Sequence, residues 1–259
     1  MHEKDGIDNM TKQNADQSGP LPRDGTRPSA NQADFDEQPA FPKSTSMEKI
    51  YNDLGNIWTS IVLLSQSPPR TILICSATRG EGCTATSSHF SLYLALTHGL
   101  RVLCVNTDVF STRECFPVPK ATEYFGLAAH LDGRHPLPSL ILPTAYPNLF
   151  VLPAGSDKSG PGARDLVFTK RTLEDLVSYC NDHFDITIFN GQPVTSHPSV
   201  IELARLVDQV VLVCRYGNSR REVSRLAVDR LKESGVTRIG AILTDRRYPI
   251  PAGLYRILK

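Results

Sequence analysis

The feature that most constrains the fold is a strand, a glycine-rich loop, a helix and a second strand in immediate succession. "RTILICSA" at 70–77 and "RVLCVNTD" at 101–108 are short apolar runs typical of buried strands. Between them, "TATSSHFSLYLALTHG" at 84–99 predicts a helix that ends at Gly99. Two strands joined through a helix run parallel, so we expect a sheet whose faces are covered by helices.

The same alternation continues toward the C-terminus. Residues 109–147 are harder to interpret, because they contain several prolines and one short helical candidate at 121–131. Beyond them the sequence predicts strands at 148–155, 185–193, 208–217 and 238–245, and helices at 171–182, 198–206 and 219–234. We therefore predict an α/β fold with a mainly parallel sheet flanked by helices on both faces.

The N-terminal part differs in composition. Residues 1–45 are rich in Pro, Gly, Asp, Gln, Asn and Ser and nearly lack aliphatic residues, so they cannot bury enough apolar area to offset the entropy of ordering. We predict a disordered tail at 1–45 and a folded domain at 46–259. The domain begins with a helix that has Ser46 as candidate N-cap and an apolar face made by Ile50, Leu54, Ile57, Trp58, Ile61 and Leu64.

Charge and cysteine usage narrow the function classes. The chain has 28 Lys and Arg against 27 Asp and Glu, so its composition does not indicate a nucleic acid or an anionic membrane as partner. Its six cysteines form no CxxC pair, and the histidines show no metal-binding spacing, so we expect no metal site. No stretch approaches the ~18 apolar residues needed to cross a bilayer. We expect a cytoplasmic protein without a transmembrane segment of its own.

The loop "SATRGEGCTATSS" at 76–88 resembles the phosphate-loop pattern GxxxxGK[ST], in which backbone amides at a helix N-terminus hold a phosphate. Cys83 stands where the pattern has lysine. We favour a small-residue replacement over a reactive thiol at this position, and we favour a solvated Arg79 over one that swings toward a phosphate. The candidate nucleotide-binding residues are Arg79, Gly80, Glu81, Gly82, Cys83, Thr84 and Ala85.

From about residue 48 onward the chain resembles the bacterial tyrosine kinases (BY-kinases) of capsule and exopolysaccharide synthesis, within the MinD and ParA group of P-loop ATPases. "SATRGEGCTA" is similar to that family's "SAxPGEGKST", "RVLCVNTD" to its "VLLVDAD", and "FDITIFNGQPV" to its "YDYVIIDTPPV". The motifs follow one another in the family's order and spacing. The resemblance therefore implies a P-loop NTPase fold of the MinD and BY-kinase type.

The departures from the family's pattern fall on charged positions. Cys83 replaces the loop lysine, while Asn106 and Asn190 replace the acids of the second and third motifs. Thr244 stands where the family has an asparagine beside the adenine. Phosphoryl transfer depends on positioned charge, and losing one such contact costs on the order of 10² to 10³ in rate. We therefore predict that the Walker motifs are degenerate and that no residue acts in catalysis. The family residues that remain are Gly80, Gly82, Thr84 and Asp108.

The resemblance implies a function in polysaccharide synthesis. The favoured hypothesis is a pseudokinase that regulates or scaffolds an exopolysaccharide biosynthesis and export complex through a membrane-embedded polysaccharide co-polymerase (Wzz-like) partner, and so lies at the inner membrane. ATP or ADP would bind, if at all, without strong Mg²⁺ dependence. The alternatives are an active ATP-binding tyrosine autokinase or ATPase that uses Asp108 and Thr84, and, less favoured, a MinD-like positioning ATPase.

Two further family features are altered. The C-terminal tyrosine cluster is reduced to Tyr248 and Tyr255, for which we favour packing over phosphorylation. Asp53, Asn56 and Thr59 stand where the family's ExxRxxR oligomerisation motif is expected, so ring assembly through its arginines is not predicted. The sequence does not decide whether the chain forms a homo-oligomer through other contacts.

Overall fold

The computed structural model describes residues 45–65, 67–109, 113–118, 126–155 and 168–245. The predicted disordered tail, apart from its last residue, lies outside this part of the chain. So do the two C-terminal tyrosines and the first half of the helical candidate at 121–131.

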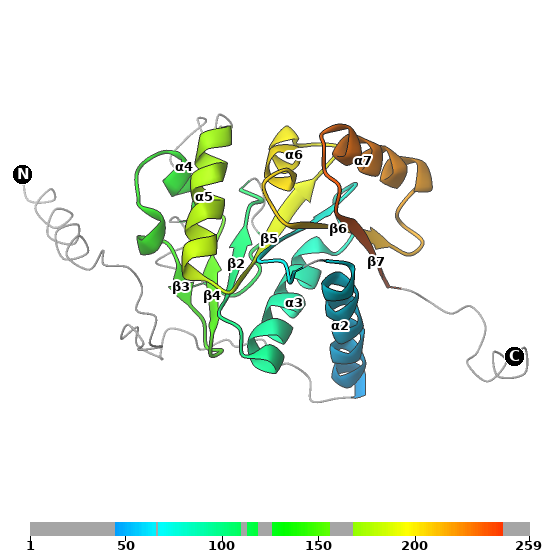
Figure 1. The fold of residues 1–259 in the computed structure, drawn as a ribbon, viewed down its shortest axis with the longest axis horizontal. Coiled ribbons are helices and arrows are strands. Elements are labelled where there is room, and N and C mark those ends of the chain that lie inside the picture. The colour runs from blue at the N-terminus through cyan, green and yellow to red at the C-terminus, as the bar shows by residue number, and fades with distance from the viewer. Residues whose placement is uncertain (1–44, 66, 110–112, 119–125, 156–167, 246–259) are drawn as a thin grey trace, which may run out of the picture.

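A seven-stranded sheet with the order β3-β4-β2-β5-β1-β6-β7 forms the centre of the domain (Figure 1). All neighbouring strands are parallel except β3, which runs antiparallel to β4. The predicted mainly parallel sheet is confirmed, although the two-residue β3 was not foreseen. The strands are β1 (Thr71–Ser76), β2 (Val102–Asn106), β3 (Leu142–Pro143), β4 (Leu149–Leu152), β5 (Ile186–Pro193), β6 (Gln209–Arg215) and β7 (Ile239–Thr244).

Helices cover both faces of the sheet, as predicted (Figure 1). Two apolar clusters lie between the layers, one under α2 and α3 and the other under α4 to α7. β1, β2 and β5 are buried along their whole length, which agrees with the apolar runs in β1, β2 and the first half of β5. The helices are α2 (Thr45–Leu64), α3 (Cys83–His98), α4 (Leu127–Leu131), α5 (Lys170–His183), α6 (Pro198–Ala204) and α7 (Arg221–Glu233), with a 3₁₀ turn at Leu137–Ser139.

The apolar face of α2 packs on the domain itself. The Trp58 ring lies 6.2 Å from that of Phe90 and 5.9 Å from that of His98, and Tyr51 meets Tyr93 edge-on at 5.7 Å. Aromatic pairs at these separations add to the stabilisation from buried area. The position of α2 is therefore fixed against α3, next to the loop that follows β1.

A bulge interrupts the pairing of β1 with β5. Ile74 is paired with Asn190 but Ser76 with Pro193, so β5 carries one extra residue over this stretch. Gly191 lies in the bulge, where its backbone approaches β1 too closely for a side chain. The bulge directly follows Asn190, one of the residues singled out in the sequence.

We predict that Gly191→Ala destabilises the protein. An added Cβ would lie 2.7 Å from Leu73 Cδ1 and 3.2 Å from Cys75 Cβ, and both neighbours are fully buried. Such overpacking costs about 1–3 kcal/mol of unfolding free energy, to be measured by urea denaturation. The matched control is Gly240→Ala, whose Cβ would come no closer than 3.6 Å to another atom and should change stability by less than about 0.5 kcal/mol. Equal stabilities of the two variants would contradict the prediction.

Candidate phosphate-binding site

The carboxyl ends of the central strands meet the N-terminus of α3 at one edge of the sheet. β1 lies between β5 and β6 there, and ligands of open α/β sheets bind at such a reversal of strand order. A cleft of about 1280 Å³ opens at this point, between the loop after β1, α2 and the end of β7. All seven candidate nucleotide-binding residues, Arg79 to Ala85, line it together with Asp108 and Asn190, whereas Asn106 is buried beside it.

The loop after β1 has the backbone that its glycines predict. Gly80 and Gly82 have φ angles of 85° and 102°, in the left-handed region that favours glycine. No side chain caps the N-terminus of α3 at Gly82, so the first amides of the helix are left for the cleft. This arrangement suits an anion.

The Glu81 side chain supports the loop. It is only 1% exposed, and its carboxylate accepts hydrogen bonds from the Ala77 N–H at 3.1 Å, the Thr78 hydroxyl at 2.9 Å and the Ser219 hydroxyl at 2.8 Å. The Thr244 hydroxyl donates to the Glu81 carbonyl at 3.0 Å and ties the loop to β7. These bonds hold the loop in shape and give Glu81 a structural role.

Cys83 is the first residue of α3 and is partly buried. Burial raises the pKa of its thiol to about 12, and the nearby Glu81 charge adds to the effect, although a hydrogen bond with Ser76 opposes it. The thiol is therefore protonated at neutral pH. This fits the small-residue interpretation, and the side chain brings no positive charge to the cleft.

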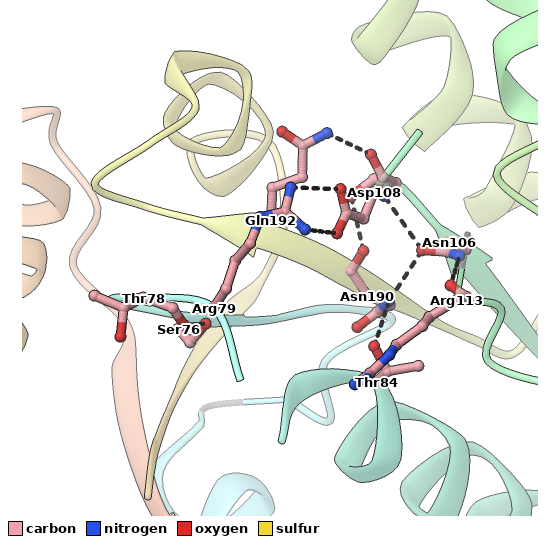
Figure 2. Close-up of polar contacts among 10 residues, drawn as sticks. Ser76, Thr78, Arg79, Thr84, Asn106, Asp108, Arg113, Asn190 and Gln192 are labelled. Atoms are coloured by element: carbon pink, nitrogen blue, oxygen red, sulfur yellow. Dashed lines mark hydrogen bonds and ion pairs between the residues drawn. The ribbon is translucent and has the colours of Figure 1, made fainter. Parts of the chain in front are cut away.

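Two asparagine side chains join the ends of β2 and β5. Asn190 Nδ2 donates to Asn106 Oδ1 at 2.9 Å, and both side chains are buried (Figure 2). The Asn106 Oδ1 atom also accepts from the Asp108 N–H at 3.2 Å, and Asn190 Nδ2 lies 3.4 Å from the Thr84 hydroxyl. Two carboxylates at this separation would repel each other, whereas two amides form a hydrogen bond.

Glu114 was not found from the sequence, and it fixes the orientation of this amide pair. Asn106 Nδ2 donates to Glu114 Oε2 at 2.8 Å and to the Arg113 carbonyl at 2.9 Å, so its oxygen must face Asn190. Glu114 also accepts from the Ala154 N–H at 3.0 Å. Burial raises the pKa of its carboxyl above the usual value, against the effect of these hydrogen bonds. Glu114 is a lone acid in a proline-containing segment without hydrophobic periodicity, so no sequence pattern indicated that it belongs to the site.

Arg79 and Asp108 form an ion pair across the cleft (Figure 2). The two guanidinium nitrogens lie 3.0 and 3.4 Å from the two carboxylate oxygens. The Asp108 side chain is only 14% exposed, while that of Arg79 is 52% exposed. Arg79 is therefore half-exposed and paired with Asp108, so the acid retained from the family pattern already has a cationic partner.

The charges that line the cleft are balanced, with four cations, four carboxylates and a histidine. Arg215 pairs with Asp245 at 2.7 Å and donates to the Gly80 carbonyl at 3.3 Å. Arg113 extends from beside Asn106 toward Thr84 (Figure 2). The charged residues of the lining are Lys49, Arg79, Arg113, Arg215, Asp53, Glu81, Asp108 and Asp245.

The donor set fits a phosphate better than it fits a metal ion. Loop amides and the surrounding cations suit an anion. Mg²⁺ prefers carboxylate oxygens, yet the amides of Asn106 and Asn190 are bonded to each other and Asp108 is paired with Arg79. Within the described part of the chain, no three His, Cys, Asp or Glu side chains are grouped closely enough to hold a metal.

Fold and loop define a P-loop NTPase-like domain, and comparison with known proteins narrows the class. No protein-family model matches the chain. The tyrosine-protein kinase CpsD of Streptococcus agalactiae is 26% identical over 174 residues, which cover 67% of this chain and 74% of the relative. The Escherichia coli tyrosine-protein kinase etk is 29% identical over 175 residues, 66% of this chain but only 23% of the relative.

Solved structures support the fold. The kinase domain of the E. coli tyrosine kinase ETK superposes with a TM-score of 0.70 at 22% identity and covers 83% of each chain. The MinD protein of Pyrococcus horikoshii, complexed with Mg-ADP, gives a TM-score of 0.56 at 21% identity over 73% of this chain and 76% of MinD. The homologues of this chain are bacterial tyrosine kinases, and its fold is that of their kinase domains and of MinD-type P-loop ATPases.

We predict that Asn190→Asp destabilises the protein at neutral pH by about 1–3 kcal/mol. The new carboxylate would face Asn106 Oδ1, which cannot turn away without losing Glu114. Burial should raise the pKa of the introduced carboxyl, so the loss is present at neutral pH and shrinks as pH falls and the group is protonated. Urea denaturation at neutral and acidic pH measures this. Exposed Asn52→Asp is the control, and an equal, pH-independent effect in both variants would contradict the prediction.

The protonated Cys83 thiol should resist alkylation in the folded protein. With a pKa of about 12, roughly one thiol in 10⁴ is ionised at pH 8. Iodoacetamide should therefore label Cys83 at least about 100-fold more slowly in the native chain than in guanidinium chloride, as followed by mass spectrometry of its peptide. Rapid labelling of the native chain would instead assign Cys83 as a reactive thiol.

Proposed function

We propose that this chain is a catalytically degenerate relative of the BY-kinases that regulates or scaffolds an exopolysaccharide biosynthesis and export complex. It would do so by binding a membrane-embedded polysaccharide co-polymerase (Wzz-like) partner rather than by phosphorylating a substrate. The proposal rests on homology to the capsule-type tyrosine kinases for the process and on the geometry of the cleft for the absence of turnover.

The observation that carries the proposal is the 2.9 Å hydrogen bond between Asn190 and Asn106. It lies where the family pattern has two acids, at the point where a metal and the transferred phosphate would have to be placed. An amide pair carries no charge to hold Mg²⁺, and Cys83 adds no cation in place of lysine. The remaining acid, Asp108, is neutralised by Arg79.

Nucleotide binding is a separate question from turnover. The uncapped amides of α3 and the left-handed glycines of the loop are intact, so ATP or ADP phosphates would be held mainly by backbone groups. Arg113 and Arg215 line the same cleft and supply positive charge. We propose that any binding of ATP or ADP depends little on Mg²⁺, because the Asn106–Asn190 pair brings no charge to the ion and Asp108 is paired with Arg79.

The partner is inferred from the relatives. Their names include CpsD and a putative tyrosine-protein kinase in the cps region of Klebsiella pneumoniae, which point to capsule loci. Kinases of this family act with a membrane co-polymerase, and we propose the same kind of partner here. Among the described residues, no helix has both the length and the apolar character needed to cross a bilayer. We propose that a co-polymerase partner brings the chain to the inner membrane.

One alternative is an active autokinase or ATPase, because the relatives are named as kinases and Thr84 and Asp108 are retained. In that case Asp108 would have to exchange Arg79 for a metal or a substrate. The MinD-like positioning ATPase has weaker support, since the likeness to MinD concerns the fold alone.

We predict that the purified full chain hydrolyses ATP no faster than the buffer background and shows no phosphotyrosine after incubation with ATP and Mg²⁺. The physical reason is the missing charge at Cys83, Asn106 and Asn190. Phosphate release and an anti-phosphotyrosine blot measure turnover, and calorimetry with ATP, with and without Mg²⁺, measures binding.

Asp108→Ala is the matched control for this experiment. Activity that disappears in Asp108→Ala would overturn the proposal in favour of an active enzyme. Activity that is equal in both proteins would point to a contaminating ATPase and leave the pure chain without turnover, as proposed.

A further inference from the structure

Within the part of the chain that the structure describes, the last strand of the sheet has an open edge. β7 ends the strand order, and no described strand pairs with its outer side. Its sequence, "IGAILT", has no charged residue, and the Leu243 side chain is 52% exposed. Proteins normally protect such apolar edges with charges, prolines or a covering element, because an open edge recruits another strand. Figure 1 places β7 at the end of the sheet beside α7.

The backbone of β7 has hydrogen-bonding groups free for such pairing. The Val210 N–H donates to the Arg238 carbonyl and the Tyr216 N–H to the Thr244 carbonyl, so even-numbered residues of this stretch face β6. The alternate residues Ala241 and Leu243 therefore direct their N–H and C=O groups to the open side. Their side chains are both exposed, on the face of the sheet that carries α7.

A groove of about 640 Å³ runs between β7 and α7. Its apolar lining comes from Leu212, Val228, Ala241 and Leu243. A row of cations on α7 lies along it, because Arg221, Arg225 and Lys232 are spaced by four and seven residues and so share one helix face.

The charge of the groove is one-sided. Among the described residues, Asp229 is the only carboxylate in its lining, and it pairs with Arg225 at 3.9 Å. Within the described part of the chain, Arg221 and Lys232 form no ion pair. A ligand that fits must therefore combine apolar side chains, an extended backbone and negative charge.

We propose that this groove and the β7 edge bind an extended acidic peptide segment of a partner protein, which adds to the sheet as an outer strand. In this mode, backbone hydrogen bonds to Ala241 and Leu243 supply affinity, and the cations of α7 select acidic side chains. The inference goes beyond the proposed function, since it requires no nucleotide, and it concerns the side of β7 toward α7, although Ala241 and Leu243 also line the edge of the phosphate-loop cleft.

Charge argues against two other occupants. Residues 246–259 of this chain contain Arg246, Arg247, Arg256 and Lys259 and no acid, so the α7 cations would repel them. A second copy that paired through its own β7 would bring the same cationic row to the contact. An acidic partner segment satisfies both the apolar edge and the positive charge. The chain's own residues 1–44 also have more acids than bases, and the deletion experiment below separates them from a partner segment.

The first test uses a fluorescein-labelled peptide of alternating glutamate and valine and its lysine-valine counterpart, with the full-length chain. Fluorescence anisotropy should show binding of the acidic peptide that weakens with added salt, and none of the cationic one. No binding of the acidic peptide, or equal binding of both, would overturn the proposal.

Matched variants locate the site. The double variant Arg221→Glu, Lys232→Glu should weaken binding of the acidic peptide about tenfold or more, since each reversal turns an attraction into a repulsion. Arg171→Glu, an exposed cation on α5, should leave it unchanged. Equal affinities in all three proteins would place binding elsewhere and contradict the inference.

The backbone contribution is tested by Ala241→Pro. This substitution removes an N–H that faces the open edge and leaves the bonds to β6 intact, so we expect a folded protein that no longer binds. Ala241→Ser keeps the N–H and should still bind. If the proline variant fails to fold, the charge variants still decide the question.

Two further results would assign the groove to another occupant and so overturn the proposal. One is a dimer of the full chain, seen by light scattering, that Ala241→Pro converts to monomer. The other is peptide binding that occurs only after residues 1–44 or 246–259 are removed, which would assign the groove to the chain's own segments.

Discussion

The hydrogen bond between Asn190 and Asn106 is the contact on which the candidate site depends. These residues lie opposite each other in the parallel pairing of β5 with β2, so their side chains must share one small buried space. A buried polar group has to be satisfied, and here each amide is satisfied by the other and by its surroundings. The pair is neutral, so the last residue of β2 and its partner on β5 bring no charge to the phosphate loop.

The charges near the cleft are arranged around that neutral pair. Glu114 accepts from Asn106 on the side away from Asn190, and Arg79 covers Asp108 on the cleft side. Were Asn106 an aspartate, it would repel Glu114, so the two residues form one electrostatic unit. A site of this kind keeps the shape of a phosphate loop while the carboxylates of Glu81, Asp108 and Asp245 are engaged in contacts within the protein. This arrangement is the basis of our proposal that the protein acts without turnover.

The carboxyl-terminal half of β7 borders both surfaces of functional interest. Thr244, at its carboxyl end, is bonded to the phosphate loop through the Glu81 carbonyl, while Ala241 and Leu243 face the groove beside α7. A segment that added to the β7 edge would therefore lie one strand away from the loop. Binding at the groove and binding at the cleft are separate proposals, but residues of β7 border both sites.

The sequence by itself determined the architecture. Continuous apolar runs such as "ILIC" suit only strands buried on both faces, and the glycines at 80 and 82 fixed the left-handed loop before α3, because both signals are local. Tertiary structure alone decided which side chains meet. The bond between Asn106 and Asn190, the ion pair of Arg79 with Asp108 and the insertion of Glu114 join segments distant in the chain. Strand register and the path of a proline-containing loop set those contacts, and neither leaves a periodic pattern in the sequence.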